Sequence, residues 1–126
     1  MESQEKFLVI LTKGDEDGGE AATLAFAFAN SALSLELDTT IFLTGKGVLW
    51  GQEGSAGDIN LFGFGKLQDL IRSFLEEGGH IISCGTCVNY CALGSNEDAR
   101  CLLEGVKLGG LASVITLTKD SRSISF

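Results

Sequence analysis

The sequence predicts an α/β fold, a three-layer α/β/α sandwich around a mainly parallel sheet of about five strands. Short, continuously apolar runs such as residues 7–11 are typical of strands that helices cover on both faces. These runs alternate along the chain with helix-like segments, which is the order that βαβ units produce. The chain has 126 residues, of which 44% are hydrophobic, so we expect residues 1–126 to form a single domain.

The first half of the chain is predicted to form a strand, a helix, a second strand and a long loop. Residues 7–11 are the first strand, and the Ala, Leu and Glu content of residues 20–36 favours a helix. Residues 39–44 are the second strand. The glycine-rich passage 45–65, which contains Trp50, is long for a compact domain, so it is either a lid or partner-contact loop or a packed excursion.

The second half is predicted to contain three more strands with helices between them. Residues 67–75 carry apolar side chains at the spacing of an amphipathic helix, and residues 80–83 follow as a short buried strand. Asn96 can cap a helix over residues 97–104. The remaining strand, helix and last strand are residues 106–108, 111–118 and 121–126, where the helix supplies the connection that parallel strands need.

Charge and composition exclude several classes of function. Nine basic and seventeen acidic residues give a net charge of -8, and no basic stripe is present, so we expect no nucleic-acid partner. No apolar stretch approaches the roughly 18 residues that a membrane span needs. The acidic turn at residues 14–20 has neither the glycine spacing nor the lysine of a nucleotide-binding loop, and we expect no cofactor. We predict a soluble, cytoplasmic protein with reduced cysteines.

The cysteines carry the candidate chemistry. Cys84 and Cys87 directly follow the short strand 80–83, and ligand sites form at the carboxyl ends of parallel strands. If a helix begins at Gly85 or Thr86, its N-terminus should lower the pKa of Cys84 by about one unit at most. Cys84 is therefore the candidate nucleophile, and Cys87 is the candidate resolving cysteine.

Other readings of the same residues stay open. Cys91 and Cys101 are either small buried hydrophobic residues or part of the site. Four thiolates could also bind zinc or an iron–sulfur cluster, although one C-x2-C pair without a second is a weak metal signal. We interpret His80 as a surface residue at the end of a strand rather than as a catalytic base.

Four separated blocks of the chain resemble the DsrE family of sulfur-relay proteins. Residues 24–29 resemble the first helix of the family, and residues 40–48 resemble its second strand and the Gly-Val turn that follows. Residues 84–87 correspond to the cysteine turn after the third strand. Residues 103–111 are similar to a helix–strand–helix segment.

The resemblance implies an α/β/α sandwich that assembles into homo-oligomers. It also implies that a turn cysteine, Cys84 or Cys87, carries persulfide sulfur between donor and acceptor proteins. Thr86 stands where related sequences often have proline. The alternative is a non-catalytic interaction or small-ligand-binding module of the same fold, and the sequence leaves open whether the protein is a sulfurtransferase component.

Overall fold

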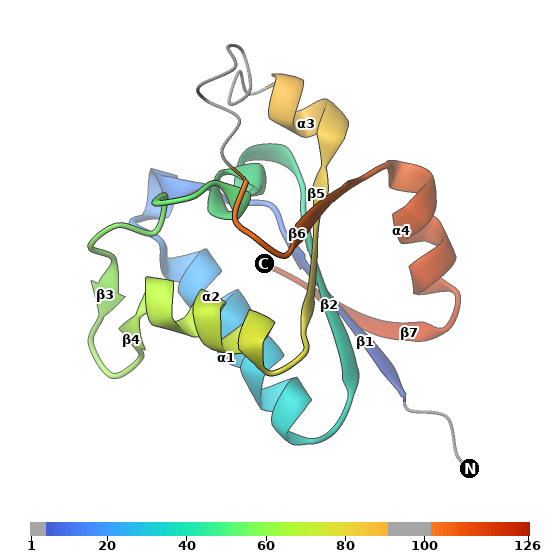
Figure 1. The fold of residues 1–126 in the computed structure, drawn as a ribbon, viewed down its shortest axis with the longest axis horizontal. Helices are drawn as coiled ribbons and strands as arrows, with labels where there is room; N and C mark the ends of the chain where they lie inside the picture. The colour runs from blue at the N-terminus through green and yellow to red at the C-terminus, as the bar shows by residue number, and fades with distance from the viewer. Residues whose placement is uncertain (1–4, 91–101) are drawn as a thin grey trace.

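The computed structural model describes residues 5–90 and 102–126 and confirms the predicted α/β fold (Figure 1). Its main sheet has five strands in the order β6-β5-β2-β1-β7, and all neighbouring strands are parallel. The strands are β1 (Lys6–Leu11), β2 (Asp38–Leu43), β5 (His80–Cys84), β6 (Val106–Gly109) and β7 (Ser121–Ser125). Each corresponds to a strand that the sequence predicts.

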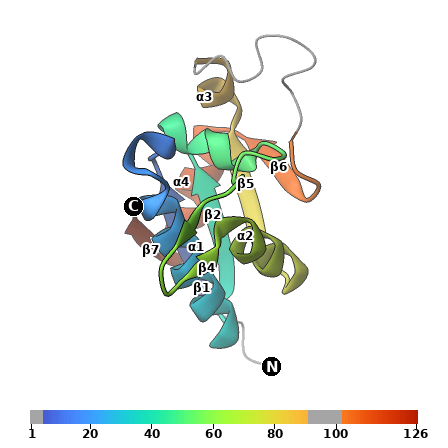
Figure 2. The ribbon, with the colours of Figure 1, turned by 90° about the vertical axis from the view of Figure 1, so that its left-hand side faces the viewer.

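Helices cover both faces of this sheet. Helices α1 (Glu20–Ser34) and α2 (Leu67–Glu76) lie together on one face, and α4 (Leu111–Thr118) lies on the other (Figures 1 and 2). Phe26 of α1 and Phe74 of α2 meet edge to face, with 5.9 Å between their ring centroids. A short helix, α3 (Gly85–Tyr90), extends directly from the end of β5. The three layers follow from the apolar face of each helix packing against the sheet.

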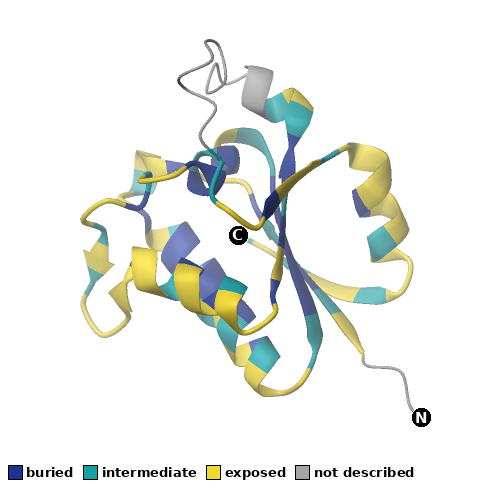
Figure 3. Cartoon of the chain, in the orientation of Figure 1, coloured by how far each residue is buried: buried dark blue, intermediate teal, exposed yellow. Residues whose placement is uncertain are grey.

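The core lies between the sheet and the pair formed by α1 and α2. Val9, Ile41 and Ile81 are aligned across three neighbouring strands, and each is at most 1% exposed. Figure 3 shows the buried residues along the strands and on the inner sides of α1 and α2. Complete burial of such a side chain contributes about 1.5–3 kcal/mol, so this row holds the centre of the sheet together.

The passage 45–65 is partly a packed excursion. It begins with a 3-10 helix, η2 (Gly45–Gly51), and continues to a small hairpin, β3 (Asn60–Leu61) and β4 (Gly65–Lys66). Trp50 is completely buried, and its indole N–H donates a 2.8 Å hydrogen bond to the carbonyl oxygen of Lys13. The part of the passage around Trp50 is therefore packed, whereas Phe62, in the same passage, is 103% exposed.

Residues 102–104, the expected end of the helix predicted over residues 97–104, are not helical. Asn96 and residues 97–101 lie outside the described residues. Leu102 forms an isolated antiparallel bridge with Gln52, and the backbone N–H of Leu103 donates to the carbonyl of Gly51 at 2.9 Å. These backbone groups pair with the end of η2 instead of with a helical turn. A turn then leads into β6.

Candidate functional site

The cysteine turn lies at the junction of β5 and α3. Cys84 is the last residue of β5 and Gly85 is the first residue of α3, so a helix does begin directly after Cys84. The backbone N–H of Cys87 donates a 3.3 Å hydrogen bond to the Cys84 sulfur. This contact satisfies one of the N–H groups that a helix N-terminus leaves without a partner. The two cysteines are therefore held side by side in one helical turn.

Cys84 is almost inaccessible. Its exposed fraction is 1%, and this burial raises the pKa of its thiol above the ordinary value. The hydrogen bond with the Cys87 side chain acts in the same direction, and the backbone N–H groups of Cys87 and Thr86 oppose it more weakly. The expectation of a lowered pKa at Cys84 is wrong because the loss of hydration outweighs the helix N-terminus.

Cys87 has the opposite character. It is only partly buried. Burial by itself would raise its pKa, but hydrogen bonds from the Cys84 side chain, from the Thr44 hydroxyl group and from the Gly45 backbone N–H outweigh that effect. The pKa of Cys87 therefore lies below its ordinary value. The pair thus combines a partly buried Cys87 of lowered pKa with a buried Cys84 of raised pKa, and a cysteine of lowered pKa that is not fully buried is suited to nucleophilic sulfur chemistry.

Thr44 is the residue of the site that sequence reasoning missed. The register pairs Leu43 of β2 with Ser83 of β5, so the next residues, Thr44 and Cys84, lie at the same edge of the sheet. The Oγ1 atom of Thr44 is 3.4 Å from the sulfur of Cys87. The sequence did contain a signal for this contact, because residues that follow neighbouring parallel strands lie together at the carboxyl edge of the sheet. From the sequence alone, Thr44 is identified only as the last residue of the predicted strand 39–44.

His80 lies far from the cysteines, at the opposite end of β5. It is exposed, as expected from the sequence, and its Nε2 atom is 3.7 Å from a carboxylate oxygen of Asp38 at the start of β2. Cys84 is four positions further along the strand, which corresponds to about 13 Å. His80 is therefore not within reach to act as a base for either thiol.

The described part of the cysteine turn does not supply enough ligands for a metal ion. Within residues 5–90 and 102–126, no three His, Cys, Asp or Glu side chains come close enough together to hold a metal ion. Cys91 and Cys101, which a four-thiolate site would need, lie outside the described residues. None of the described helices is both long and apolar enough to span a membrane.

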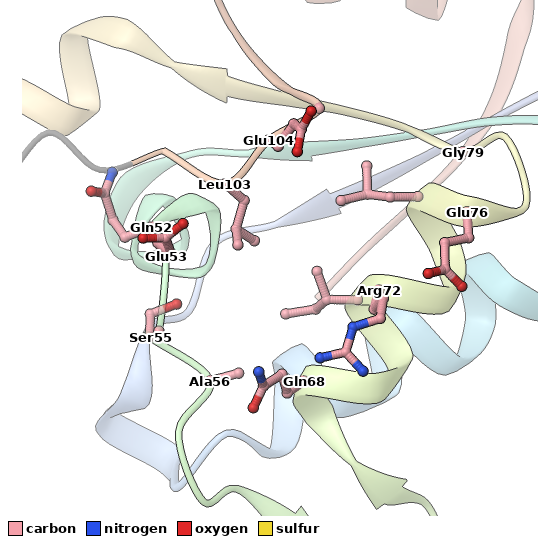
Figure 4. Close-up of a pocket in the computed structure, with 14 residues that line it drawn as sticks. Gln52, Glu53, Ser55, Ala56, Gln68, Arg72, Glu76, Gly79, Leu103 and Glu104 are labelled. Atoms are coloured by element: carbon pink, nitrogen blue, oxygen red, sulfur yellow. The ribbon is translucent and has the colours of Figure 1, made fainter.

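A separate open cleft of about 600 Å³ lies between α2, residues 52–56 and residues 103–105 (Figure 4). Neither Cys84 nor Cys87 lines it. Arg72 extends from α2 into its lower part, and its guanidinium group is paired with Asp69 at 3.3 Å. The carboxylates at its walls are Glu53, Glu76 and Glu104. This cleft contributes no group to the thiol chemistry of the cysteine turn.

The sequence matches a known protein family and is similar to two archaeal proteins. The profile of the DsrE/DsrF-like family matches residues 5–126. Uncharacterized protein MK0008 of Methanopyrus kandleri is 30% identical over 109 residues, which are 86% of this chain and 84% of that protein. Uncharacterized protein MJ0989 of Methanocaldococcus jannaschii is 30% identical over 120 residues, which are 94% of this chain and 96% of that protein.

Solved structures share the fold. The crystal structure of the ychN protein from E. coli superposes with a TM-score of 0.77 at 19% identity, covering 98% of this chain and 100% of that one. A conserved protein of unknown function from Bacteroides thetaiotaomicron, BT1422, superposes with a TM-score of 0.59 at 19% identity, covering 96% and 95%. At these identities, the likeness establishes the arrangement of the strands and helices and says nothing of the activity.

Proposed function

Because the chain belongs to the DsrE/DsrF-like family, we propose that it is a small cytoplasmic sulfur-relay protein, built as a single domain. It carries sulfane sulfur as a persulfide on a cysteine of the turn formed by Cys84 and Cys87. The observation that supports this function best is the partly buried Cys87, whose sulfur accepts hydrogen bonds that lower its pKa. Cys87 is thus the better carrier, and Cys84 is its buried partner.

Loading needs no external oxidant. The Cys87 thiolate attacks the outer sulfur of a donor persulfide, R–S–SH, forming the bond from Cys87 to that sulfur. The donor S–S bond breaks, its electron pair stays on the donor as R–S⁻, and the proton stays on the transferred sulfur. The product is Cys87–S–SH. Delivery is the same exchange in the other direction, with the thiolate of an acceptor protein as the attacking group and the Cys87 thiolate as the leaving group.

A second release route would use Cys84. Its thiolate would attack the inner sulfur of the Cys87 persulfide, expel hydrosulfide and leave a disulfide between Cys84 and Cys87, which a dithiol reductant would have to reopen. Burial raises the pKa of Cys84, so little of its thiolate is present at neutral pH. Direct transfer to an acceptor thiolate is therefore the favoured route.

Sulfur loading tests the proposal directly. The purified protein is incubated with a cysteine desulfurase and cysteine, or with a rhodanese and thiosulfate, and its intact mass is measured. We expect a gain of one sulfur atom that cyanide removes, and peptide mapping should locate it at Cys87. Cys84→Ser is the matched control and should still load, whereas Cys87→Ser should not. A wild-type protein that gains no sulfur, or a Cys87→Ser variant that loads normally, contradicts the proposal.

The second part of the proposal is a homo-oligomer. Leu111 and Ile115 are four residues apart on α4, which places them on one side of the helix, and they are 60% and 63% exposed. Leu108 in the edge strand β6 is 58% exposed. Apolar groups of this kind mark contact surfaces when they gather together.

An oligomer that loads no sulfur would favour the alternative function, a non-catalytic interaction module of the same fold.

Analytical ultracentrifugation at micromolar concentration measures the assembly state. We expect the wild-type protein to sediment as an oligomer and Ile115→Glu to shift it toward monomer, because a carboxylate would have to be buried at the contact. Ser113→Glu, on an exposed position of the same helix, is the control and should not change the sedimentation. A monomeric wild-type protein rules the assembly out.

A further inference from the structure

The sulfur of Cys87 contacts groups that come from a different strand. Thr44 and Gly45 follow β2, whereas Cys87 belongs to α3, and 43 residues separate Thr44 from Cys87 in the sequence. The hydroxyl oxygen of Thr44 is 3.4 Å from the Cys87 sulfur, and the backbone N–H of Gly45 also donates to this sulfur. Helix α3 and the 3-10 helix η2, which begins at Gly45, pack against each other.

We propose that Thr44 is a positioning residue: its hydroxyl group, together with the Gly45 N–H, stabilises the Cys87 thiolate that accepts and releases sulfane sulfur. This inference rests on the proposed carrier function. The Thr44 hydroxyl group lies outside the cysteine turn, and in this inference it controls the reactivity of Cys87.

Chemistry sets the direction of this hydrogen bond. In the contact between Thr44 and Cys87, either the hydroxyl group or a thiol could be the donor. A thiolate has no hydrogen atom, so in the reactive state only the Thr44 hydroxyl group can donate. Hydrogen bonds to a charged acceptor are about twice as strong as those between neutral groups. Thr44 therefore binds the thiolate more strongly than the thiol.

The backbone holds Thr44 in place before any substrate binds. Its N–H donates to the Leu11 carbonyl at 3.1 Å, and its own carbonyl accepts from the Gly47 N–H at 2.9 Å. A Cβ atom at Gly47 would overlap the carbonyl oxygen of Leu11, so only glycine lets η2 lie this close to β1. With both backbone groups bonded, the hydroxyl group is the free functional group of Thr44 and lies against Cys87. When the thiolate forms, only the hydroxyl hydrogen has to point toward the sulfur, because the oxygen is already in place.

This donor affects both directions of sulfur exchange. During loading it raises the fraction of Cys87 that is present as thiolate at neutral pH. During delivery the same thiolate is the leaving group, and a leaving group of lower pKa departs faster. The price is a moderately weaker nucleophile, because the intrinsic reactivity of a thiolate falls as its pKa falls.

The test compares three variants by the pH dependence of iodoacetamide alkylation at Cys87, followed by peptide mass spectrometry. Thr44→Val keeps the side-chain shape without the hydroxyl group, and Thr44→Ser keeps the hydroxyl group. Thr12→Val is the matched control, because Thr12 follows β1 as Thr44 follows β2, and its hydroxyl group donates to the Phe126 carbonyl instead. Unfolding midpoints of all three establish that they are folded.

Thr44→Val should raise the pKa of Cys87 by about one unit, because the thiolate loses a charge-assisted hydrogen bond and sulfur is a weak partner. Below the pKa of both proteins, the variant has less thiolate, but each thiolate is more reactive; with a Brønsted coefficient of about 0.4–0.5, its alkylation should be about threefold slower than that of the wild type. Above the pKa of both proteins, Cys87 is fully ionised in each, and alkylation of the variant should be about threefold faster. A merely structural defect would not reverse sign with pH. Thr44→Ser and Thr12→Val should titrate like the wild type.

The outcomes separate this inference from the carrier function. If Thr44→Val titrates like the wild type, or if Thr44→Ser titrates like Thr44→Val, the assignment of Thr44 is wrong, whether or not the protein loads sulfur. If the wild type gains no sulfur but Thr44→Val shows the shift, the thiolate assignment stands and the carrier function fails. Slower discharge of loaded Thr44→Val to a small thiol, with normal discharge of Thr12→Val, supports both.

Discussion

Trp50 is the sharpest test of how the passage 45–65 is built. It is the only tryptophan of the chain, it is completely buried, and its indole N–H bonds to the carbonyl of Lys13. This contact ties η2 to the loop after β1. Phe62, an aromatic residue in the same passage, is 103% exposed. The structure therefore predicts that substitution of Trp50 destabilises the protein and that substitution of Phe62 has little effect, although both are aromatic residues of the same glycine-rich passage.

The magnitude follows from what Trp50→Phe removes. The lost hydrogen bond is worth about 1 kcal/mol. Truncating a buried Trp to Ala costs about 3–5 kcal/mol, and loss of only the smaller ring leaves a fraction of that cavity, about 1–2 kcal/mol. The free energy of unfolding should fall by about 2–3 kcal/mol. For a domain of this size, the melting temperature should then fall by about 10 °C. Phe62→Ala should change the free energy of unfolding by less than about 0.5 kcal/mol.

Chemical denaturation followed by far-UV circular dichroism measures both variants, because it does not depend on the tryptophan signal. Acrylamide quenching of the wild-type fluorescence is an independent check and should be weak for a buried indole. If Trp50→Phe is as stable as the wild type and the wild-type fluorescence is readily quenched, Trp50 is a surface lid, and the placement of η2 against the loop after β1 is wrong.

Other predictions test the cysteine turn and its support. With rising pH, iodoacetamide should modify Cys87 before Cys84, because hydrogen bonds lower one pKa and burial raises the other; the reverse order would restore Cys84 as the nucleophile. Cys84→Ala removes a donor to Cys87, so Cys87 alkylation should titrate at higher pH, whereas Cys84→Ser should stay near the wild type. Gly47→Ala should lower the free energy of unfolding by about 1–3 kcal/mol through overlap with the Leu11 carbonyl, measured in urea against Gly85→Ala, whose Cβ would meet nothing within 4 Å. His80→Gln should leave the alkylation profile of Cys87 unchanged, and a shifted profile would place His80 in the site.

The sheet and its helices could be predicted from the sequence because local patterns determine them. The run at residues 7–11 is apolar throughout since helices cover both faces of β1, and the spacing of apolar residues in 67–75 directly marks the buried side of α2. Burial of Trp50 could not be predicted in this way. It depends on the contact between η2 and the loop after β1, which are far apart in the sequence, and glycine-rich segments carry no periodic signal.

The position of the cysteines could be predicted from the sequence, but the division of roles between them could not. The helix N-terminus was the only source of thiolate stabilisation visible in the sequence, because no charged residue occurs from Gly78 to Asn96. That reasoning selects Cys84, the residue nearest the helix start. Two features that shift the pKa values arise only in the fold. Neighbouring elements bury Cys84, and the end of β2 brings the hydroxyl group of Thr44 to Cys87. A pKa is set by the difference between lost hydration and gained hydrogen bonds, so the less buried cysteine with more donors has the lower pKa, even though it lies farther along the helix.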